Sequence, residues 1–297
     1  METIDDVAFA SVNGIRIAYE TFGSRRDRPL LLIMGLGSQM VQWDDSFCRR
    51  LAEKKYWVIR FDNRDIGLST HFDRMRVPDP LEIGNAWLRG ENPVLPYTLL
   101  DMAKDAIGLI EALELESAHV VGESMGGMIA QLMAIHYRRH LRTLTSLMST
   151  TGAPDLPPPT AEVLDILQRP FPTDRDRYVD AFAAALAILN GPRIPVDGAL
   201  ARKWALQSYE RGLNPPGVAR QYAAVVAAGD RTGELKTVTV PTLVIHGDTD
   251  PLLPLPCGRA IAEAVPNADL KIISGMGHAL MPAVWDEVIE AIAGHAV

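Results

Sequence analysis

Short apolar runs alternate with amphipathic helical segments along most of this chain, and this alternation constrains the fold more than any other sequence feature. The predicted strands cover residues 15–21, 30–34, 57–61, 119–121, 144–148, 242–245 and 270–273. Most of these runs are apolar at consecutive positions, as in a parallel sheet that is covered on both faces. The predicted helices cover residues 47–55, 99–115, 124–138, 258–265 and 284–293. The pattern therefore predicts a three-layer α/β fold.

Residues 152–236 interrupt this alternation. They begin with several prolines and continue with helical patterns at 161–167, 175–189, 198–207 and 218–228, without a convincing buried strand. We therefore expect residues 1–151 and 237–297 to form a core domain and 152–236 to form a helical cap over the carboxyl ends of the strands. A series of ordinary crossover helices is the alternative.

Charge and apolar content exclude some classes of protein. A net charge of −8 disfavours a nucleic-acid partner, because phosphate binding needs clustered lysine and arginine. The acidic start of the chain does not resemble a signal peptide, and the apolar runs are too short to span a bilayer. Cys48 and Cys257 are too few for a disulfide framework, although they could pair if the fold brought them together. We expect a cytoplasmic enzyme without a membrane partner; a mature secreted protein is the alternative.

The strongest chemical signal is the segment from Gly122 to Gly127, which follows a predicted strand and opens a predicted helix. A tight turn at this place holds the Ser124 hydroxyl clear of the backbone, and the flanking glycines remove side chains that would clash there. The same turn places the Met125 N–H at a helix N-terminus, where it can stabilise an oxyanion. Ser124 is therefore the candidate nucleophile. An inert Gly-Ser turn is the alternative.

A serine nucleophile needs a base, and His278 is the candidate among seven histidines. It alone lies in a glycine-flanked loop directly after a predicted strand near the C-terminus. His136 and His140 are expected at the surface, and His119 is expected to be structural. His71 stays open as an alternative.

An acid must orient the histidine, and two aspartates after the strand 242–245 compete for this role. Asp248 lies nearer the strand end, whereas Asp250 precedes Pro251 and should have an extended backbone. Either could instead stabilise the loop by an Asx-turn. The order of Ser124, Asp250 and His278 along the chain is the order found in α/β-hydrolases.

A second oxyanion donor is expected in the loop after the strand 30–34. The glycines of Met34-Gly35-Leu36-Gly37 allow the backbone to approach a substrate, and the Leu36 N–H is the candidate donor. A plain glycine turn is the alternative. The chain shows no close pair of cysteines and no metal-binding histidine pattern, and Gly35 and Gly37 lack a third glycine at dinucleotide spacing. We therefore expect neither a metal nor a cofactor.

These residues resemble the α/β-hydrolase superfamily and, within it, bacterial carboxylesterases of the aclacinomycin methylesterase-like group. The resemblance rests on the segments 34–37, 58–69, 122–127, 241–247 and 275–278, on Trp43, and on Asp250-Pro251. It implies an eight-stranded, mostly parallel sheet with one antiparallel strand, flanking helices, a helical cap and no cofactor. It also favours Asp250 over Asp248 as the acid. Many relatives have His-Gly where this chain has Met34-Gly35, and the segment 62–69 resembles a structural loop of the family.

The expected function is hydrolysis of hydrophobic carboxylic esters, with short acyl chains or aromatic groups, through an acyl-enzyme. The candidate pocket residues are Met34, Gly35, Trp43, Phe182, Trp204 and Leu280. For each of them, packing in the core is an equal alternative. Lactonase, amidase, C–C bond hydrolase and cofactor-free perhydrolase activities would use the same serine, and a non-catalytic receptor is an alternative of another class. The expected partner is a small-molecule ester, and a homodimer is allowed for.

Overall fold

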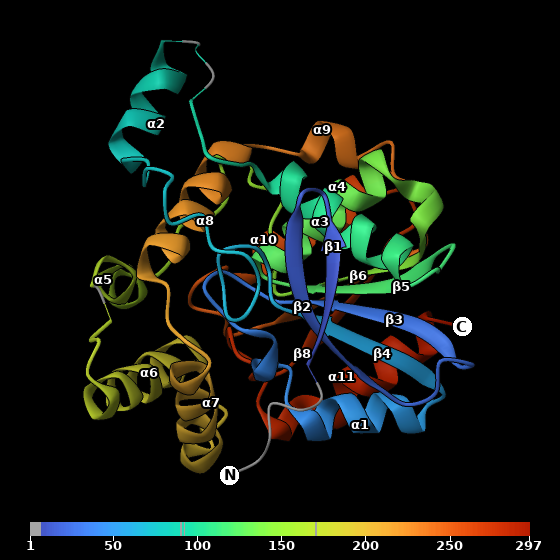
Figure 1. The fold of residues 1–297 in the computed structure, drawn as a ribbon. Helices are drawn as coiled ribbons and strands as arrows, with labels where there is room; N and C mark the ends of the chain where they lie inside the picture. The colour runs from blue at the N-terminus through green and yellow to red at the C-terminus, as the bar shows by residue number, and fades with distance from the viewer. Residues whose placement is uncertain (1–6, 90, 92, 170) are drawn as a thin grey trace.

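Eight strands form a single sheet in the order β1-β2-β4-β3-β5-β6-β7-β8 in this computed structural model (Figure 1), which describes residues 7–89, 91, 93–169 and 171–297. β2 runs antiparallel to both β1 and β4, and every other neighbouring pair from β4 onward is parallel. The eight-stranded, mostly parallel sheet with one antiparallel strand is thus confirmed. The strands are β1 (Ala8–Val12), β2 (Ile15–Phe22), β3 (Arg28–Ile33), β4 (Tyr56–Phe61), β5 (Ala118–Glu123), β6 (Leu141–Leu147), β7 (Thr242–Gly247) and β8 (Asp269–Ile273).

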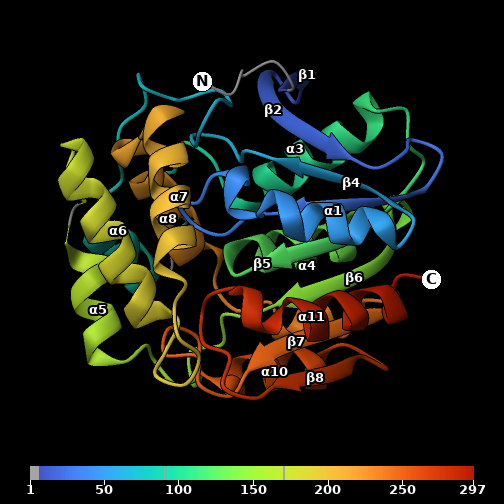
Figure 2. The same ribbon diagram turned by 90° about the horizontal axis from the view of Figure 1, so that it is seen from below.

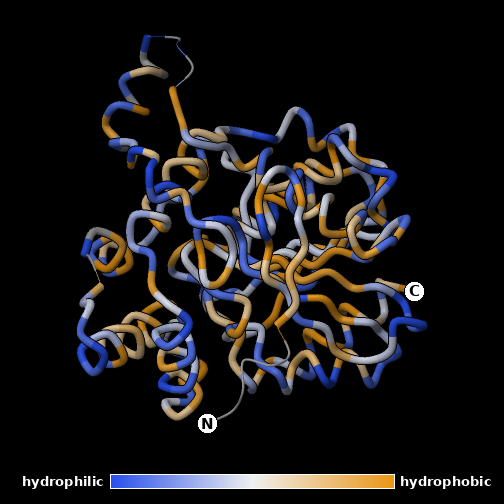
Figure 3. Tube along the Cα trace, viewed as in Figure 1, coloured by the Kyte–Doolittle hydropathy of each residue, from blue (hydrophilic) through white to orange (hydrophobic). Residues whose placement is uncertain are grey.

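Helices cover both faces of the sheet (Figure 2). On one face α1 (Asp45–Glu53) and α11 (Pro282–His295) pack on apolar side chains that include Leu30 and Leu32. On the other face α3 (Leu99–Ala112), α4 (Met125–His136) and α10 (Leu255–Ala264) pack on the alternate set, which includes Leu31 and Ile33. Figure 3 shows apolar residues concentrated along the central strands. Because helices cover both faces of the sheet, the central strands are apolar at consecutive positions.

Several elements, among them β1 and α2, were not predicted from the sequence. β1 pairs with β2 across the Asn13-Gly14 turn, and the apolar pattern did not reveal this edge strand. α2 (Pro80–Leu88) lies between β4 and α3 and extends away from the sheet (Figure 1). Two short 3₁₀ helices, η1 (Met40–Gln42) and η2 (Arg138–His140), complete the segments before α1 and after α4.

The helices between β6 and β7 lie mainly beyond the carboxyl ends of the parallel strands (Figure 2). They are α5 (Ala161–Gln168), α6 (Arg175–Leu189), α7 (Gly198–Glu210), α8 (Pro215–Ala228) and α9 (Thr232–Leu235). Some of their contacts with the core are made to loops that follow strands: the Leu189 carbonyl accepts from the His278 amide at 2.7 Å. In addition, α8 contacts α3, and α9 contacts α4 and α10. The role of residues 152–236 as a lid stays a prediction.

Buried ion pairs hold α8 to the loop after β4. Arg220 donates from Nε and Nη2 to the two carboxylate oxygens of Asp65, both at 2.8 Å. The Asp65 and Arg220 side chains are 0% and 1% exposed, and the Tyr97 hydroxyl donates to the same carboxylate. Arg211, after α7, makes a second such pair with Asp62.

Asp65→Asn should lower the free energy of unfolding by about 3–5 kcal/mol, because it leaves the buried Arg220 charge unpaired. Asp65 has a positive φ of 69°, which asparagine also adopts readily, so the substitution changes charge with little backbone cost. The control is Asp180→Asn, whose pair with Arg202 is mostly exposed (67% and 59%) and should change stability by less than about 1 kcal/mol. Urea unfolding of both variants tests this; equal losses would contradict it.

Candidate active site

Ser124 occupies a sharp turn between β5 and α4. Its φ of 54° and ψ of −118° lie outside the regions that most residues adopt. Its amide donates to the Leu147 carbonyl at 2.9 Å, which ties the turn to the end of β6. A Cβ atom on Gly122 would lie 2.1 Å from the Gly126 carbonyl oxygen, and one on Gly126 would lie 2.1 Å from the Ile33 carbonyl oxygen. Glycine is therefore required at both positions for the strand and helix to meet at this angle.

His278 lies in the loop after β8 and contacts Ser124 directly. Its Nε2 is 2.9 Å from the Ser124 hydroxyl oxygen, and its Nδ1 is 2.7 Å from Oδ2 of Asp250. The second carboxylate oxygen of Asp250 accepts from the Leu252 and Leu253 amides, which fixes the orientation of the group. The structure thus brings the three predicted residues together in one chain of hydrogen bonds.

The structure also separates the two competing aspartates. Oδ1 of Asp248 accepts from the Gly275 amide at 2.6 Å, so this residue braces the turn that precedes the histidine. Asp250, two residues further along the loop, makes the contact with the imidazole. Asp250 also accepts from the Leu252 and Leu253 amides, so it stabilises its own loop in addition to contacting the imidazole, whereas Asp248 stabilises only the turn at Gly275.

His278 is buried beside two carboxyl groups. Burial by itself lowers the pKa of His278, but the charge and hydrogen bond of Asp250, together with the charge of Glu123, outweigh this, so the net pKa is raised. Glu123 precedes the nucleophile, and burial raises its own pKa to about 7. An imidazolium formed at this position would be stabilised by the neighbouring carboxylate.

Two backbone amides lie at the places expected for an oxyanion site. Within the described part of the chain, neither the Leu36 N–H nor the Met125 N–H donates to a protein acceptor. The loop that carries Leu36 lies against the nucleophile, since a Cβ atom on Gly35 would be 3.3 Å from Cβ of Ser124. A negative oxygen formed beside Ser124 could therefore accept from both amides.

The candidate pocket residues fall into different surroundings. Trp43 is fully buried and stacks on Phe47 with ring centroids 5.7 Å apart, so its packing favours the core alternative. Met34 and Leu280 belong to the same apolar cluster. Trp204 packs with Ala279 and Met281 on either side of Leu280, and Phe182 lies beside this second cluster. These last two aromatic residues bring the helices of 152–236 against the loop that carries His278.

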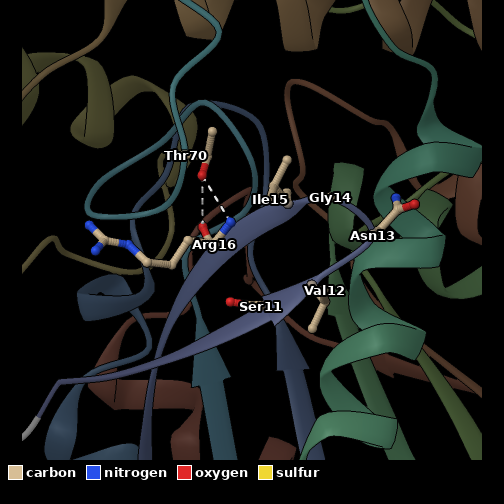
Figure 4. A pocket seen from close by; sticks show the side chains of 7 residues that line it. All are labelled: Ser11, Val12, Asn13, Gly14, Ile15, Arg16 and Thr70. Carbon is tan, nitrogen blue, oxygen red and sulfur yellow. Dashed lines mark hydrogen bonds between the residues drawn. The ribbon is translucent and has the colours of Figure 1, made fainter.

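Two surface hollows lie away from Ser124. The first, of about 420 Å³, is bounded by the β1–β2 turn (residues 11–16) and Thr70 (Figure 4). There the Thr70 hydroxyl accepts from the Arg16 amide and donates to the Arg16 carbonyl, so this hydroxyl already has protein partners. The second hollow lies between residues 153–156 and 256–264. Neither contains a candidate catalytic residue.

The remaining candidates have structural surroundings. His71 bonds to the Gly67 carbonyl and His119 to the Thr143 hydroxyl, and neither joins Ser124. Cys48 and Cys257 are both buried and unpaired, so the disulfide that their number allowed does not form. Among the described residues no cluster of three potential metal ligands occurs. Across the same residues no helix has the length and apolarity to cross a membrane. The expected cytoplasmic location stays a prediction.

Sequence reasoning missed two residues that hold the loop carrying Leu36. The Asn63 amide group donates to the Met34 carbonyl at 3.0 Å, and the Gln221 side chain accepts from the Gly37 amide at 3.0 Å. Asn63 lies in the segment 62–69 that resembled a structural loop, and Gln221 lies on α8. Nothing local in the sequence marks either residue as a neighbour of the candidate site.

Comparison with known proteins gives independent evidence on the family of this chain. A family model described as alpha/beta hydrolase fold matches residues 28–282. The rhodomycin D methylesterases DauP of Streptomyces sp. (strain C5) and DnrP of Streptomyces peucetius are 31% and 30% identical, each over 93% of this chain and 93% of its own length. A solved meta-cleavage product hydrolase from Pseudomonas fluorescens IP01 superposes with a TM-score of 0.75 at 19% identity, covering 99% of this chain and 98% of its own. At that identity the likeness concerns the fold alone.

Proposed function

Because this chain belongs to the alpha/beta hydrolase fold family, we propose that it is a serine esterase that cleaves carboxylic esters with Ser124 as nucleophile, His278 as base and Asp250 as the orienting acid. The resemblance to methylesterase-like carboxylesterases is confirmed by the two methylesterase relatives. The observation that carries the proposal is the pair of hydrogen bonds, 2.9 Å and 2.7 Å, that joins the serine to the imidazole and the imidazole to the carboxylate.

The proposed reaction has two steps. The Ser124 oxygen attacks the ester carbonyl while His278 takes its proton, and the Leu36 and Met125 amides stabilise the oxyanion. The imidazolium then protonates the alcohol as the C–O bond breaks, leaving an acyl-enzyme. Water attacks this acyl group with His278 again as the base, and the acid product leaves with Ser124 restored.

Methyl esters of bulky apolar acids are the proposed substrates. The two relatives are named for removing a methyl ester from rhodomycin D. The helices that face His278 present apolar and aromatic side chains, including Phe182 and Trp204. Such walls favour a hydrophobic acyl group, while methanol needs little room to leave.

A panel of methyl, ethyl and longer esters of aromatic acids, with matched lactones and amides, tests this function. We expect esters to be hydrolysed faster than the matched amides, and kcat/KM to be highest for esters of small alcohols. A fluorophosphonate probe should label Ser124 in the same preparation, since an activated serine attacks the phosphorus. Hydrolysis of amides or lactones alone would contradict the ester assignment. A protein that hydrolyses none of these substrates and is not labelled by the probe would support the receptor alternative.

A further inference from the structure

The candidate oxyanion donor Leu36 lies in a tight turn of residues 35–38. The Ser38 amide donates to the Gly35 carbonyl at 3.3 Å, and Gly37 has a φ of +71°, as the third residue of a type II turn requires. The Gly35 carbonyl and the Leu36 N–H belong to one peptide group and point in opposite directions. The turn therefore sets the direction of the Leu36 N–H.

Two buried side chains hold the peptide groups on either side of this one. Asn63 donates to the carbonyl of Met34, which precedes it. Gln221 accepts from the amide of Gly37, which follows it. The middle peptide of a β-turn can reverse between types I and II, and an acceptor for the Gly37 N–H selects one orientation.

Gln221 bridges two backbone groups and is fully buried. Its Oε1 accepts from the Gly37 amide at 3.0 Å, and its Nε2 donates to the Arg64 carbonyl at 2.8 Å. An N–H can only donate and a carbonyl can only accept, so these two partners settle the orientation of the side-chain amide. The glutamine therefore ties the turn that carries Leu36 to the loop after β4.

The helix that carries Gln221 is itself held firmly at this point. Its neighbour Arg220 pairs with Asp65, and a Cβ atom on Gly217 would lie 2.3 Å from the Asp65 carbonyl oxygen. Val218 contacts the turn directly, since a Cβ atom on Gly37 would be 3.1 Å from its Cγ1. One turn of α8 thus packs on the turn of residues 35–38 and on the loop after β4.

We propose that Gln221 is a positioning residue for ester hydrolysis, which holds the Leu36 N–H toward the oxyanion from a helix that belongs to the inserted region. This inference rests on the proposed function. It gives the region 152–236 a task besides its predicted role as a cap: one of its helices holds the turn that carries the candidate oxyanion donor. Gln221 touches neither substrate nor the reacting atoms.

Gln221→Met keeps the volume of the side chain and removes both hydrogen bonds. Loss of a whole oxyanion donor lowers kcat by about 10²–10³-fold, so a donor that is only loosened should cost about 10- to 100-fold. KM should change by less than about twofold, because the interaction strengthens in the transition state. Binding of a trifluoromethyl ketone, which forms an oxyanion on Ser124, should weaken in parallel with kcat, and the pH profile should keep its shape.

Gln131→Met is the matched control. Gln131 is also fully buried and also bridges two groups: its Nε2 donates to the Thr150 carbonyl and its Oε1 accepts from Arg231. It joins Thr150, just before the inserted region, to Arg231 near the end of that region, and among the described residues it makes no hydrogen bond to the loop that carries Leu36. Gln131→Met should lower the melting temperature and leave kcat and the affinity for the ketone close to wild type. If Gln221 had only a structural role, Gln221→Met would show this same result.

Gln221→Asn provides a second variant, because its shorter amide cannot reach both partners. Wild-type kcat in either folded variant would overturn the inference. In the wild-type enzyme, the Gly37 amide should exchange its hydrogen slowly by NMR, and fast exchange would also overturn it, whether or not the variants fold. If the wild-type protein turns over no ester and takes no fluorophosphonate, the proposed function fails; if it does both and Gln221→Met retains kcat, only this inference fails.

Discussion

Ser124→Ala is expected to lower kcat for ester hydrolysis by about 10⁴–10⁶-fold, the range seen when a serine hydrolase loses its nucleophile. Alanine lacks the oxygen that attacks the carbonyl, so no acyl-enzyme can form. The amides of Leu36 and Met125 and the surrounding binding surface stay in place, so a small residual rate above that in water should persist. Steady-state assays with an aromatic methyl ester, together with the loss of fluorophosphonate labelling, measure this effect.

Ser146→Ala is the control for this experiment. Ser146 lies on β6 opposite Gly122, and its hydroxyl is buried without a partner among the described residues. Removing such a group costs little stability, and the residue does not contact the imidazole. This variant should hydrolyse esters at close to the wild-type rate. A Ser124→Ala enzyme within about tenfold of wild type would rule out Ser124 as the nucleophile, since loss of a true nucleophile costs orders of magnitude more.

Asp250→Asn is expected to lower kcat by about 10³–10⁴-fold while leaving the fold intact. The asparagine amide would present an N–H to Nδ1 of His278, which must then accept it. The remaining ring proton moves to Nε2, the atom that must receive the proton of Ser124. The imidazole would be held 2.9 Å from the serine in the wrong tautomer.

Asp248→Asn separates this effect from loop damage. Its carboxamide oxygen can still accept from the Gly275 amide, so the turn before the histidine should survive. We expect a loss of less than about tenfold, in the range of an ordinary change outside the reacting groups. If Asp248→Asn were the more damaging of the two, the assignment of the acid would be wrong.

The pH dependence of kcat/KM tests the role of Asp250 in a second way. Asp250 and Glu123 raise the pKa of His278, and only the neutral imidazole can act as a base, so activity should be present above this pKa and fall as the pH drops through it. Asp250→Asn removes the attraction that raises the pKa, and its acid limb should move to lower pH. An acid limb that stays in place would show that another group controls it.

The sequence predicted the central strands well because the sheet is covered on both faces. Strands such as β4 and β7 are buried at every position, so most of their residues are apolar and the strands are easily found. β1 lies at the edge of the sheet and exposes Phe9, so it carries no such signal. Among the described residues, α2 contacts α8, so it lies outside the alternation of strands and covering helices on which the prediction was based.

Some features of the candidate site could likewise be predicted from the sequence, and others could not. The turn around Ser124 could be identified from its glycines because it is a local structure of six residues. The residues around the loop left Asp248 and Asp250 open, and only the family resemblance favoured Asp250; its contact with the imidazole, which enters from the loop after β8, is visible only in the structure. Trp43 was proposed for the pocket from its neighbourhood in the sequence, whereas the stacking on Phe47 that places it in the core is visible only in three dimensions.

Taken alone, the sequence determined the layered α/β architecture, the sharp turn at the serine and the chain order of serine, aspartate and histidine, because hydrophobic periodicity and turn chemistry act over short stretches. Only the tertiary structure decided which aspartate meets the imidazole and which glutamine holds the oxyanion turn. Those contacts join residues 28 and 184 positions apart. Their partners are set by how the helices pack on the strand ends, and no local pattern encodes that packing.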